Sequence, residues 1–147
     1  LVAAQHDGSQ KIGRIRMRQV SDLSRATLHA FIGENIEPDS VVRTDGLETY
    51  GGLKDYRHEP IVSAGSGQPA DELLPRVHRV VSLLKRWLLG THQGAVSHKH
   101  LDYYLDEFTF RFNRRTSASR GKLFYRLVQQ AAQAEPHPYH SIVHPHR

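Results

Sequence analysis

Cysteine is absent from this 147-residue sequence, which excludes disulfide bonds and zinc sites built on cysteine thiolates. Long apolar runs are absent too, and a transmembrane helix needs roughly eighteen or more such residues. No charged segment followed by an apolar one opens the sequence, so no secretory signal is predicted. These absences favour a protein of a reducing cytoplasm that has no membrane partner.

The residues that are present are typical of a folded domain with a basic surface. Hydrophobic residues make up 38% and charged residues 24%, which suits one globular domain. The formal net charge is +5, the sequence pI is about 9.7, and there are eleven histidines. This balance favours a polyanionic partner, above all nucleic acid. Many basic proteins bind no nucleic acid, so composition alone leaves that alternative open.

The first half of the sequence predicts strands around one helix. An apolar run over residues 1–4, turn residues, and alternation over residues 12–20 indicate a β-hairpin. Ser21 or Asp22 is expected to cap a helix that ends near residue 36, followed by a strand over residues 41–45 and an edge strand over residues 58–64. Strands joined by a crossover helix indicate an α/β layer fold. A chain that opens within a strand pattern looks like a fragment.

The second half predicts helices. After a loop over residues 63–71, a long helix is expected to reach about residue 89, with Pro75 as the first residue of its regular part. A second helix over residues 97–115 carries an apolar stripe, and a third spans residues 120–134. The Pro- and His-rich tail is expected to be extended or disordered. We therefore predict a domain over residues 1–134 and a flexible tail over residues 135–147.

Asp45 is the first candidate for chemistry. It ends an apolar strand and precedes Gly46, and sites in open α/β sheets form at the carboxyl ends of strands. A carboxylate there suits Mg²⁺, which prefers oxygen ligands, and metal-assisted phosphoryl transfer uses such carboxylates. The alternative is that residues 44–46 only form a turn.

His78 and Lys85 are the second candidates. They are seven residues apart on the predicted long helix, so they point to the same side. Arg79 and Arg86 make the helix basic and Trp87 follows, a combination that suits a nucleic-acid backbone. The alternatives are a solvated charged face and a surface histidine.

A larger block of sequence resembles a known family. It comprises HRVVSLLKRWLLGTH (residues 78–92), KHLDYYLDEF (99–108) and FRFNRR (110–115). Upstream pieces that agree are IGRIR (12–16), NIEP (35–38), TDG (44–46) with Tyr50, and YRH (56–58). Together they are similar to bacterial insertion-sequence transposases of the DDE superfamily, over residues 1–140. The stretch over residues 106–115 is the most specific part.

The resemblance implies an RNase H-like fold, with a mixed sheet, flanking helices and a helical C-terminal part. It also implies cleavage and strand transfer of DNA that depend on Mg²⁺ or Mn²⁺. The family's second aspartate falls on Asp45 and its third metal-facing position on His78, which makes both of them catalytic and metal-binding candidates. Lys85, Arg86 and Arg79 become the DNA-binding candidates. Element ends, target DNA and a homo-oligomer on DNA are the implied partners, in the nucleoid of a bacterial cytoplasm.

The sequence departs from the family's pattern at the third position. Relatives often carry Glu or Asn there, whereas imidazole is a poor ligand for Mg²⁺ and a better one for Mn²⁺. His78 could instead act as a general acid or base, or contact a phosphate. Glu72 is a nearby carboxylate that could substitute for it.

A second departure concerns the family's first aspartate. It lies on a strand before the one that begins at Leu1, and Asp7, in the hairpin turn, is in the wrong place for it. We therefore expect an N-terminally truncated domain whose first strand and one catalytic carboxylate are missing. Two alternatives stay open: a non-catalytic DNA-binding remnant, and a nuclease of the same fold. The tail histidines (His137, His140, His144, His146) suit a transition metal or are incidental.

Overall fold

The computed structural model describes residues 1–6, 8–61 and 73–143, and the chain forms two compact units, residues 1–113 and 114–147. Some sequence expectations lie outside the described residues: the turn at Asp7, the loop over residues 63–71, Glu72, His144 and His146. The domain boundary after residue 134 stays a prediction.

The first unit opens with the predicted hairpin. Strands β1 (Val2–Ala4) and β2 (Ile15–Met17) pair antiparallel, with Ala3 opposite Arg16. Helix α1 (Arg25–Asn35) follows.

Helix α1 begins later than the sequence suggested. Its N-cap is Ser24, whose hydroxyl accepts the N–H of Thr27 at 3.4 Å. Asp22 lies outside the helix and braces this cap, accepting the N–H of Ser24 and the hydroxyl of Thr27, each at 2.8 Å. Hydrogen bonds from Ser24 and then Thr27 lower the pKa of Asp22 to about 2, because they favour the ionised carboxylate.

The remaining strands form a separate sheet. Strands β3 (Val41–Thr44) and β4 (Arg57–Pro60) pair parallel, and the short 3₁₀ helix η1 (Glu48–Tyr50) lies between them in the chain. The expectation of one mixed sheet is therefore met only in its parts: the described residues form one antiparallel and one parallel pair. The reason is that no described strand joins β1 to β3.

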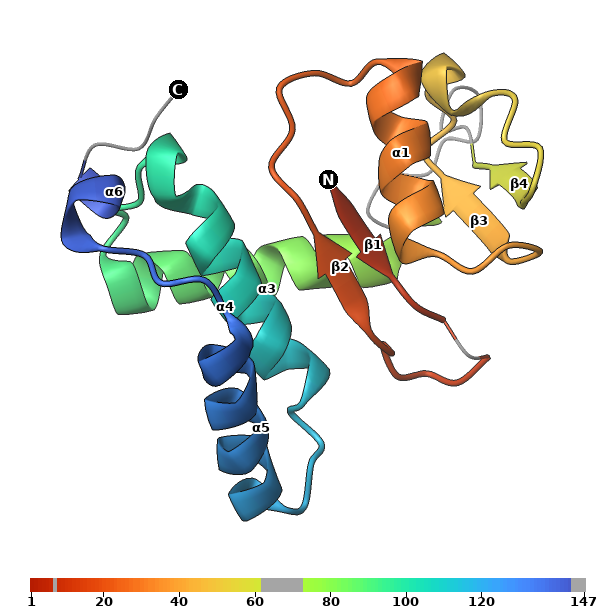
Figure 1. Cartoon of the computed structure of the whole chain (residues 1–147). Coiled ribbons are helices and arrows are strands. Elements are labelled where there is room, and N and C mark those ends of the chain that lie inside the picture. The colour runs from red at the N-terminus through yellow and green to blue at the C-terminus, as the bar shows by residue number, and fades with distance from the viewer. Residues whose placement is uncertain (7, 62–72, 144–147) are drawn as a thin grey trace. The chain divides into compact units, whose positions relative to one another are not determined.

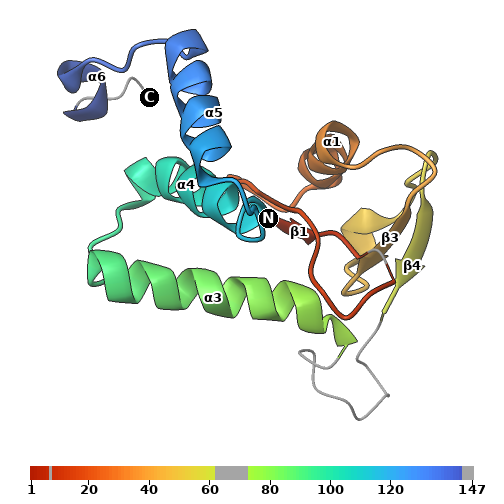
Figure 2. The same cartoon turned by 90° about the horizontal axis from the view of Figure 1, so that it is seen from below.

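Two helices cover the hairpin. Helix α3 (Pro75–His92) starts at Pro75, as predicted, and α4 (Leu101–Asn113) follows the 3₁₀ helix η2 (His98–His100). The core that joins them to β2 consists of Ile15, Val80, Phe108 and Phe112. Figure 1 shows α3 and α4 beside the hairpin, and Figure 2 shows α1 and α3 on opposite sides of the strands.

The side chain of Asn113 holds the outer edge of β2. Its carbonyl oxygen accepts the N–H of Ile15 at 2.7 Å, and its amide group donates to the carbonyl of Ile15 at 3.0 Å. These are the two backbone groups that a neighbouring strand would otherwise bond. The last residue of α4 therefore replaces a strand at this edge.

The second unit contains α5 (Arg120–Gln133), as the sequence predicted, and the short helix α6 (Tyr139–Val143). The short helix lies in the tail that was expected to be extended or disordered. Two aromatic side chains of α5, Phe124 and Tyr125, are exposed.

Replacing Asn113 tests the role of this side chain. We expect Asn113→Ala to lower the free energy of unfolding by about 2 kcal/mol, because the N–H of the buried Ile15 loses its partner and its carbonyl keeps only the donor Arg16 Nη1, at 3.1 Å. Asn35→Ala is the matched control, since that side chain makes a single hydrogen bond to Phe31 of its own helix, and its loss should cost about 1 kcal/mol or less. Urea unfolding measures both, and equal losses would contradict the role of Asn113.

Candidate active site at the end of strand β3

Asp45 lies where the sequence predicted, directly after the last residue of β3. Its side chain is exposed, and its Oδ1 accepts the N–H of Leu47 at 3.3 Å. Gly46 has a φ of +80°, a conformation that favours glycine, and this turns the chain sharply away from the strand. The carboxylate is thus held at the strand end and remains open to a ligand.

Thr44, directly before Asp45, contacts His58 of the neighbouring strand. Thr44 is buried, and its hydroxyl lies 2.9 Å from Nε2 of His58, while it also accepts the N–H of Gly46 at 3.3 Å. The parallel register places Val42 opposite His58, so the histidine reaches Thr44 diagonally across the two strands. The ring of Tyr50 lies 6.3 Å from the ring of His58. Tyr50 and His58 belong to the sequence pieces that resemble the family, but no pattern in the sequence marked them as site residues.

The pKa of Tyr50 reports on this environment. Burial raises it above 10.0, and the negative charge of Asp45 raises it further, because both disfavour the phenolate. Asp45 and Tyr50 also line the same cavity. The two side chains therefore share one electrostatic site.

The cavity beside Asp45 has a volume of about 210 Å³. Its walls come from β1, from α1 through Leu28 and Phe31, and from the start of α3 through Leu74 and Val77. His78 directly follows Val77 but does not line this cavity. The structure thus brings the start of α3 to Asp45 without bringing the imidazole of His78 into the same space.

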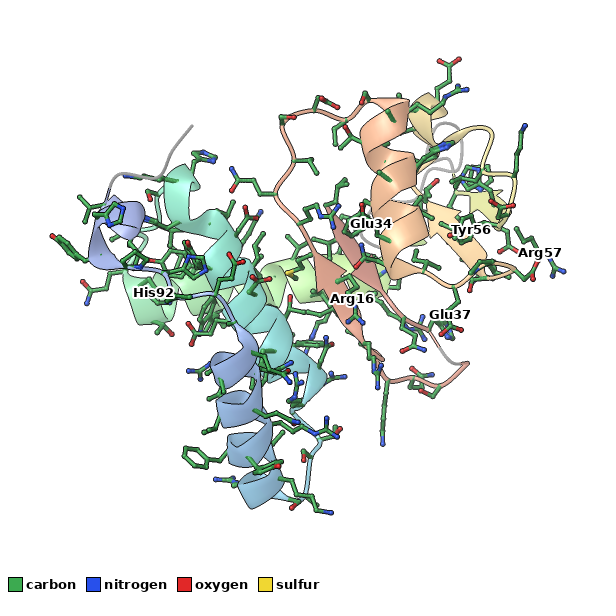
Figure 3. All side chains as sticks on the ribbon, in the orientation of Figure 1. Arg16, Glu34, Glu37, Tyr56, Arg57 and His92 are labelled. Atoms are coloured by element: carbon green, nitrogen blue, oxygen red, sulfur yellow. The ribbon has the colours of Figure 1, made fainter. Side chains whose placement is uncertain are left out.

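A second cavity, of about 790 Å³, adjoins the same strands. Arg16 of β2 and Glu37, just after α1, both line it and are labelled in Figure 3. Arg43 and Glu59, which pair at 2.8 Å between Nε and Oε2, also line it. Charges of both signs surround this space, so it is not a uniformly basic site.

The basic candidates lie on the solvent side of α3. His78, Lys85, Arg79 and Arg86 are all exposed, whereas Val80 of the same helix is fully buried. His78 and Lys85 are two turns apart on one side of the helix, as predicted. The helix thus presents a row of cationic side chains away from the core.

A divalent metal ion needs several donor groups close together. Among residues 1–6, 8–61 and 73–143, no three His, Asp or Glu side chains come close enough to hold a metal ion. Asp45 offers one hard oxygen donor, which suits Mg²⁺, and His78 does not join it in the cavity. The described residues therefore do not fit a complete metal site.

Comparison with known protein families identifies the lineage. The sequence model of the ISXO2-like transposase domain matches residues 1–113. The match covers 113 of 147 residues and ends where the first compact unit ends. The chain belongs to this transposase family. This match confirms the predicted resemblance to insertion-sequence transposases of the DDE type.

Other comparisons add little to the family match. No curated protein and no solved structure gave a significant match to this transposase domain. The described part of the transposase chain contains no helix with the length and apolar character needed to cross a membrane.

Titration of Tyr50 tests the shared site. We expect Asp45→Asn to shift the pKa of Tyr50 down towards 10.0 but not fully, since burial is the larger cause. In the unmodified domain, the stability that Tyr50 contributes is present below about pH 10 and is lost as the pH rises through the raised pKa. The difference in tyrosinate absorbance between the protein and its Tyr50→Phe variant isolates this residue.

Asp55→Asn provides the control for this titration, because the charge of Asp55 is not a cause of the Tyr50 shift. An unchanged Tyr50 pKa in Asp45→Asn, or an equal change in both variants, would contradict the shared site.

Proposed function

We propose that this domain takes part in the cleavage and strand transfer of DNA at the ends of an insertion sequence, on an RNase H-like fold. The observation that carries the proposal is the family match over the whole first unit. The order of elements also supports it: an antiparallel pair, the crossover helix α1, and then a parallel pair. Asp45 lies at the carboxyl end of β3, where α/β folds place their sites.

The proposed reaction has two steps. Water attacks the phosphorus of a phosphodiester at the element end, and the 3′-oxygen leaves with a proton as a free hydroxyl. That 3′-hydroxyl then attacks a phosphodiester of the target DNA, which releases a new 3′-hydroxyl there. DDE transposases generally use a divalent metal for this chemistry, here Mg²⁺ or Mn²⁺. Asp45 supplies one carboxylate, so a complete site requires at least one more.

Helix α3 is the proposed DNA-binding surface. Lys85, Arg86 and Arg79 are exposed on it, and cationic side chains on one helix bind phosphates without regard to sequence. His78 lies one position before Arg79 and two turns before Lys85, so a protonated imidazole would extend the same row. We include in the proposal a homo-oligomer that assembles on DNA in the bacterial nucleoid.

A non-catalytic DNA-binding protein is the second candidate. The observation that favours it is that Asp45 is the single carboxylate among the described residues that line the smaller cavity. Under this alternative, binding depends on salt and not on metal, and no nicked DNA forms.

Lys85→Ala tests the DNA-binding surface. We expect weaker binding to duplex DNA, with the slope of log affinity against log salt reduced by about 0.9, because one phosphate contact is lost. Lys54→Ala is the control, since Lys54 is also exposed but lies in the turn before β4 and not on α3. Fluorescence anisotropy over a salt series measures both variants. A Lys54 effect as large as that of Lys85 would overturn the assignment of the surface to α3.

Asp45→Ala tests the catalytic assignment. We expect this variant to lose strand transfer while DNA binding is retained. The reason is that the proposal gives Asp45 a role in the reaction and none in binding phosphate. Strand transfer is measured with labelled element-end DNA, and unchanged transfer would remove Asp45 from the site.

A further inference from the structure

The positive charge of the chain is concentrated in its second unit. Residues 1–113 contain fourteen Lys and Arg and fourteen Asp and Glu, so the formal net charge of the first unit is zero with histidine neutral. Residues 114–147 contain six Lys and Arg and a single acidic residue, and they account for the whole net charge of +5. The net attraction to a polyanion therefore comes from a unit that lies outside the family match.

Helix α5 contains cations that it cannot pair internally. In the first unit, basic side chains have acidic partners, as Arg43 has in Glu59 at 2.8 Å between Nε and Oε2. In α5, by contrast, Arg120, Lys122 and Arg126 are exposed and the helix contains no Asp or Glu. Several cations on one short helix without acids suit the phosphates of a nucleic acid.

Apolar side chains of the same helix are also exposed to water. Phe124 is 71% exposed and Tyr125 67%, while Leu127 and Val128 are each about half exposed. Leu123 is half-buried, and every other residue of α5 is exposed. Figure 1 shows α5 as one uninterrupted helix, so these side chains keep a regular spacing along it. A contiguous exposed apolar surface of this kind marks a binding site.

The helix places a cation beside each aromatic ring. Arg120 precedes Phe124 by four residues, and Lys122 precedes Tyr125 by three. Residues at these two spacings are neighbours on a helix surface. Helical side chains lean towards the N-terminus of their helix, so each ring lies over the turn that carries its cation. α5 thus offers two flat rings, each with a positive charge about one helical turn away.

We infer that α5 is a binding site for single-stranded DNA, in which unpaired bases stack on Phe124 and Tyr125 while Arg120, Lys122 and Arg126 bind the phosphates. Aromatic rings combined with cations bind unpaired strands without regard to sequence, because every base has a face that can stack. This binding goes beyond the proposed function, which assigns duplex DNA to α3, and it does not depend on that assignment.

The aromatic side chains select an unpaired strand over a duplex. The bases of a duplex are stacked on one another, so α5 would meet phosphates alone and would leave Phe124 and Tyr125 in water. An unpaired base offers its face, and stacking on a ring removes apolar surface of both partners from water. The exposed rings therefore gain a partner only from a strand whose bases are free.

A second copy of α5 is the other occupant that the apolar surface admits. Two such helices would bring six cations together with no acidic side chain from either helix, and like charges repel. A DNA strand instead contributes one negative charge for each phosphate. The charge of α5 therefore favours DNA over a second copy.

Replacing the two rings tests the stacking. We expect the whole chain to bind a fluorescein-labelled oligothymidylate, and the double variant Phe124→Leu, Tyr125→Leu to bind it at least about ten-fold more weakly, because leucine is apolar but has no π-face. Tyr139→Leu is the matched control, since Tyr139 of α6 is 80% exposed but has no Lys or Arg close to it in the sequence. Fluorescence anisotropy measures all three proteins. No binding by the unmodified chain, or equal weakening in both variants, would overturn the site.

Replacing the cations tests the phosphate contacts. We expect a variant with glutamine at positions 120, 122 and 126 to reduce the slope of log affinity against log salt by about 2, because each phosphate contact of a single strand contributes about 0.7. A control with the same loss of charge in the first unit has glutamine in place of the exposed Lys11, Arg25 and Lys54. Equal reductions in both would show that net charge alone drives binding, and would overturn the site on α5.

Duplex DNA of the same length separates this inference from the proposed function. We expect the ring variant to bind the duplex as tightly as the unmodified chain, and Lys85→Ala to retain its affinity for oligothymidylate. Equal losses of duplex and single-strand affinity in the ring variant would overturn the preference for an unpaired strand. Duplex binding that is insensitive to Lys85→Ala, with single-strand binding intact, would overturn the α3 surface and leave the α5 site standing.

Sedimentation velocity identifies a second copy as the occupant if that is the correct alternative. We expect Leu127→Gln to leave the sedimentation coefficient of the chain unchanged, because no helix pair forms through α5. A dimer that dissociates in Leu127→Gln, in a chain that does not bind oligothymidylate, would assign the apolar surface to a second copy and overturn the inference.

Discussion

The contact between Val80 of α3 and Ile15 of β2 is the constraint on which the first unit depends. Both side chains are fully buried, and Phe108 and Phe112 of α4 close around them. Because this contact fixes the rotation of α3, Val77 is turned towards the cavity beside Asp45, while Lys85 is turned to solvent. One apolar contact therefore decides both which residues approach the site and which charged side chains of α3 face solvent.

The helices could be predicted from the sequence, and the sheet arrangement could not. Helix limits depend on neighbours in the chain, such as Pro75 at the start of α3, and apolar spacing placed Leu105, Phe108 and Phe112 on the buried side of α4. Strand pairing depends on residues far apart in sequence. The clamp between Asn113 and Ile15 joins positions separated by 98 residues, and the FRFNRR block gave no indication of that role.

The candidate site, too, could be predicted from the sequence only where local patterns determine it. The position of Asp45 follows from a strand ending before a glycine, which is a local pattern. The approach of His58 to Thr44 depends on the register of β3 against β4, which no local pattern specifies. His78 and Lys85 share a side of α3 because a helix guarantees it, whereas the position of His78 relative to Asp45 is set by tertiary structure. The assignment of His78 as a metal ligand stays a prediction for this reason.

The amide of Asn113 also makes the two edges of the hairpin differ in their capacity to pair with a further strand. One border of the β1–β2 pair is sealed by a side chain, and only the other can accept a further strand. Open strand borders are where proteins aggregate or exchange segments. Within the hairpin, a strand from a second copy could therefore add beside β1 but not beside Ile15 of β2, where Asn113 already bonds the backbone.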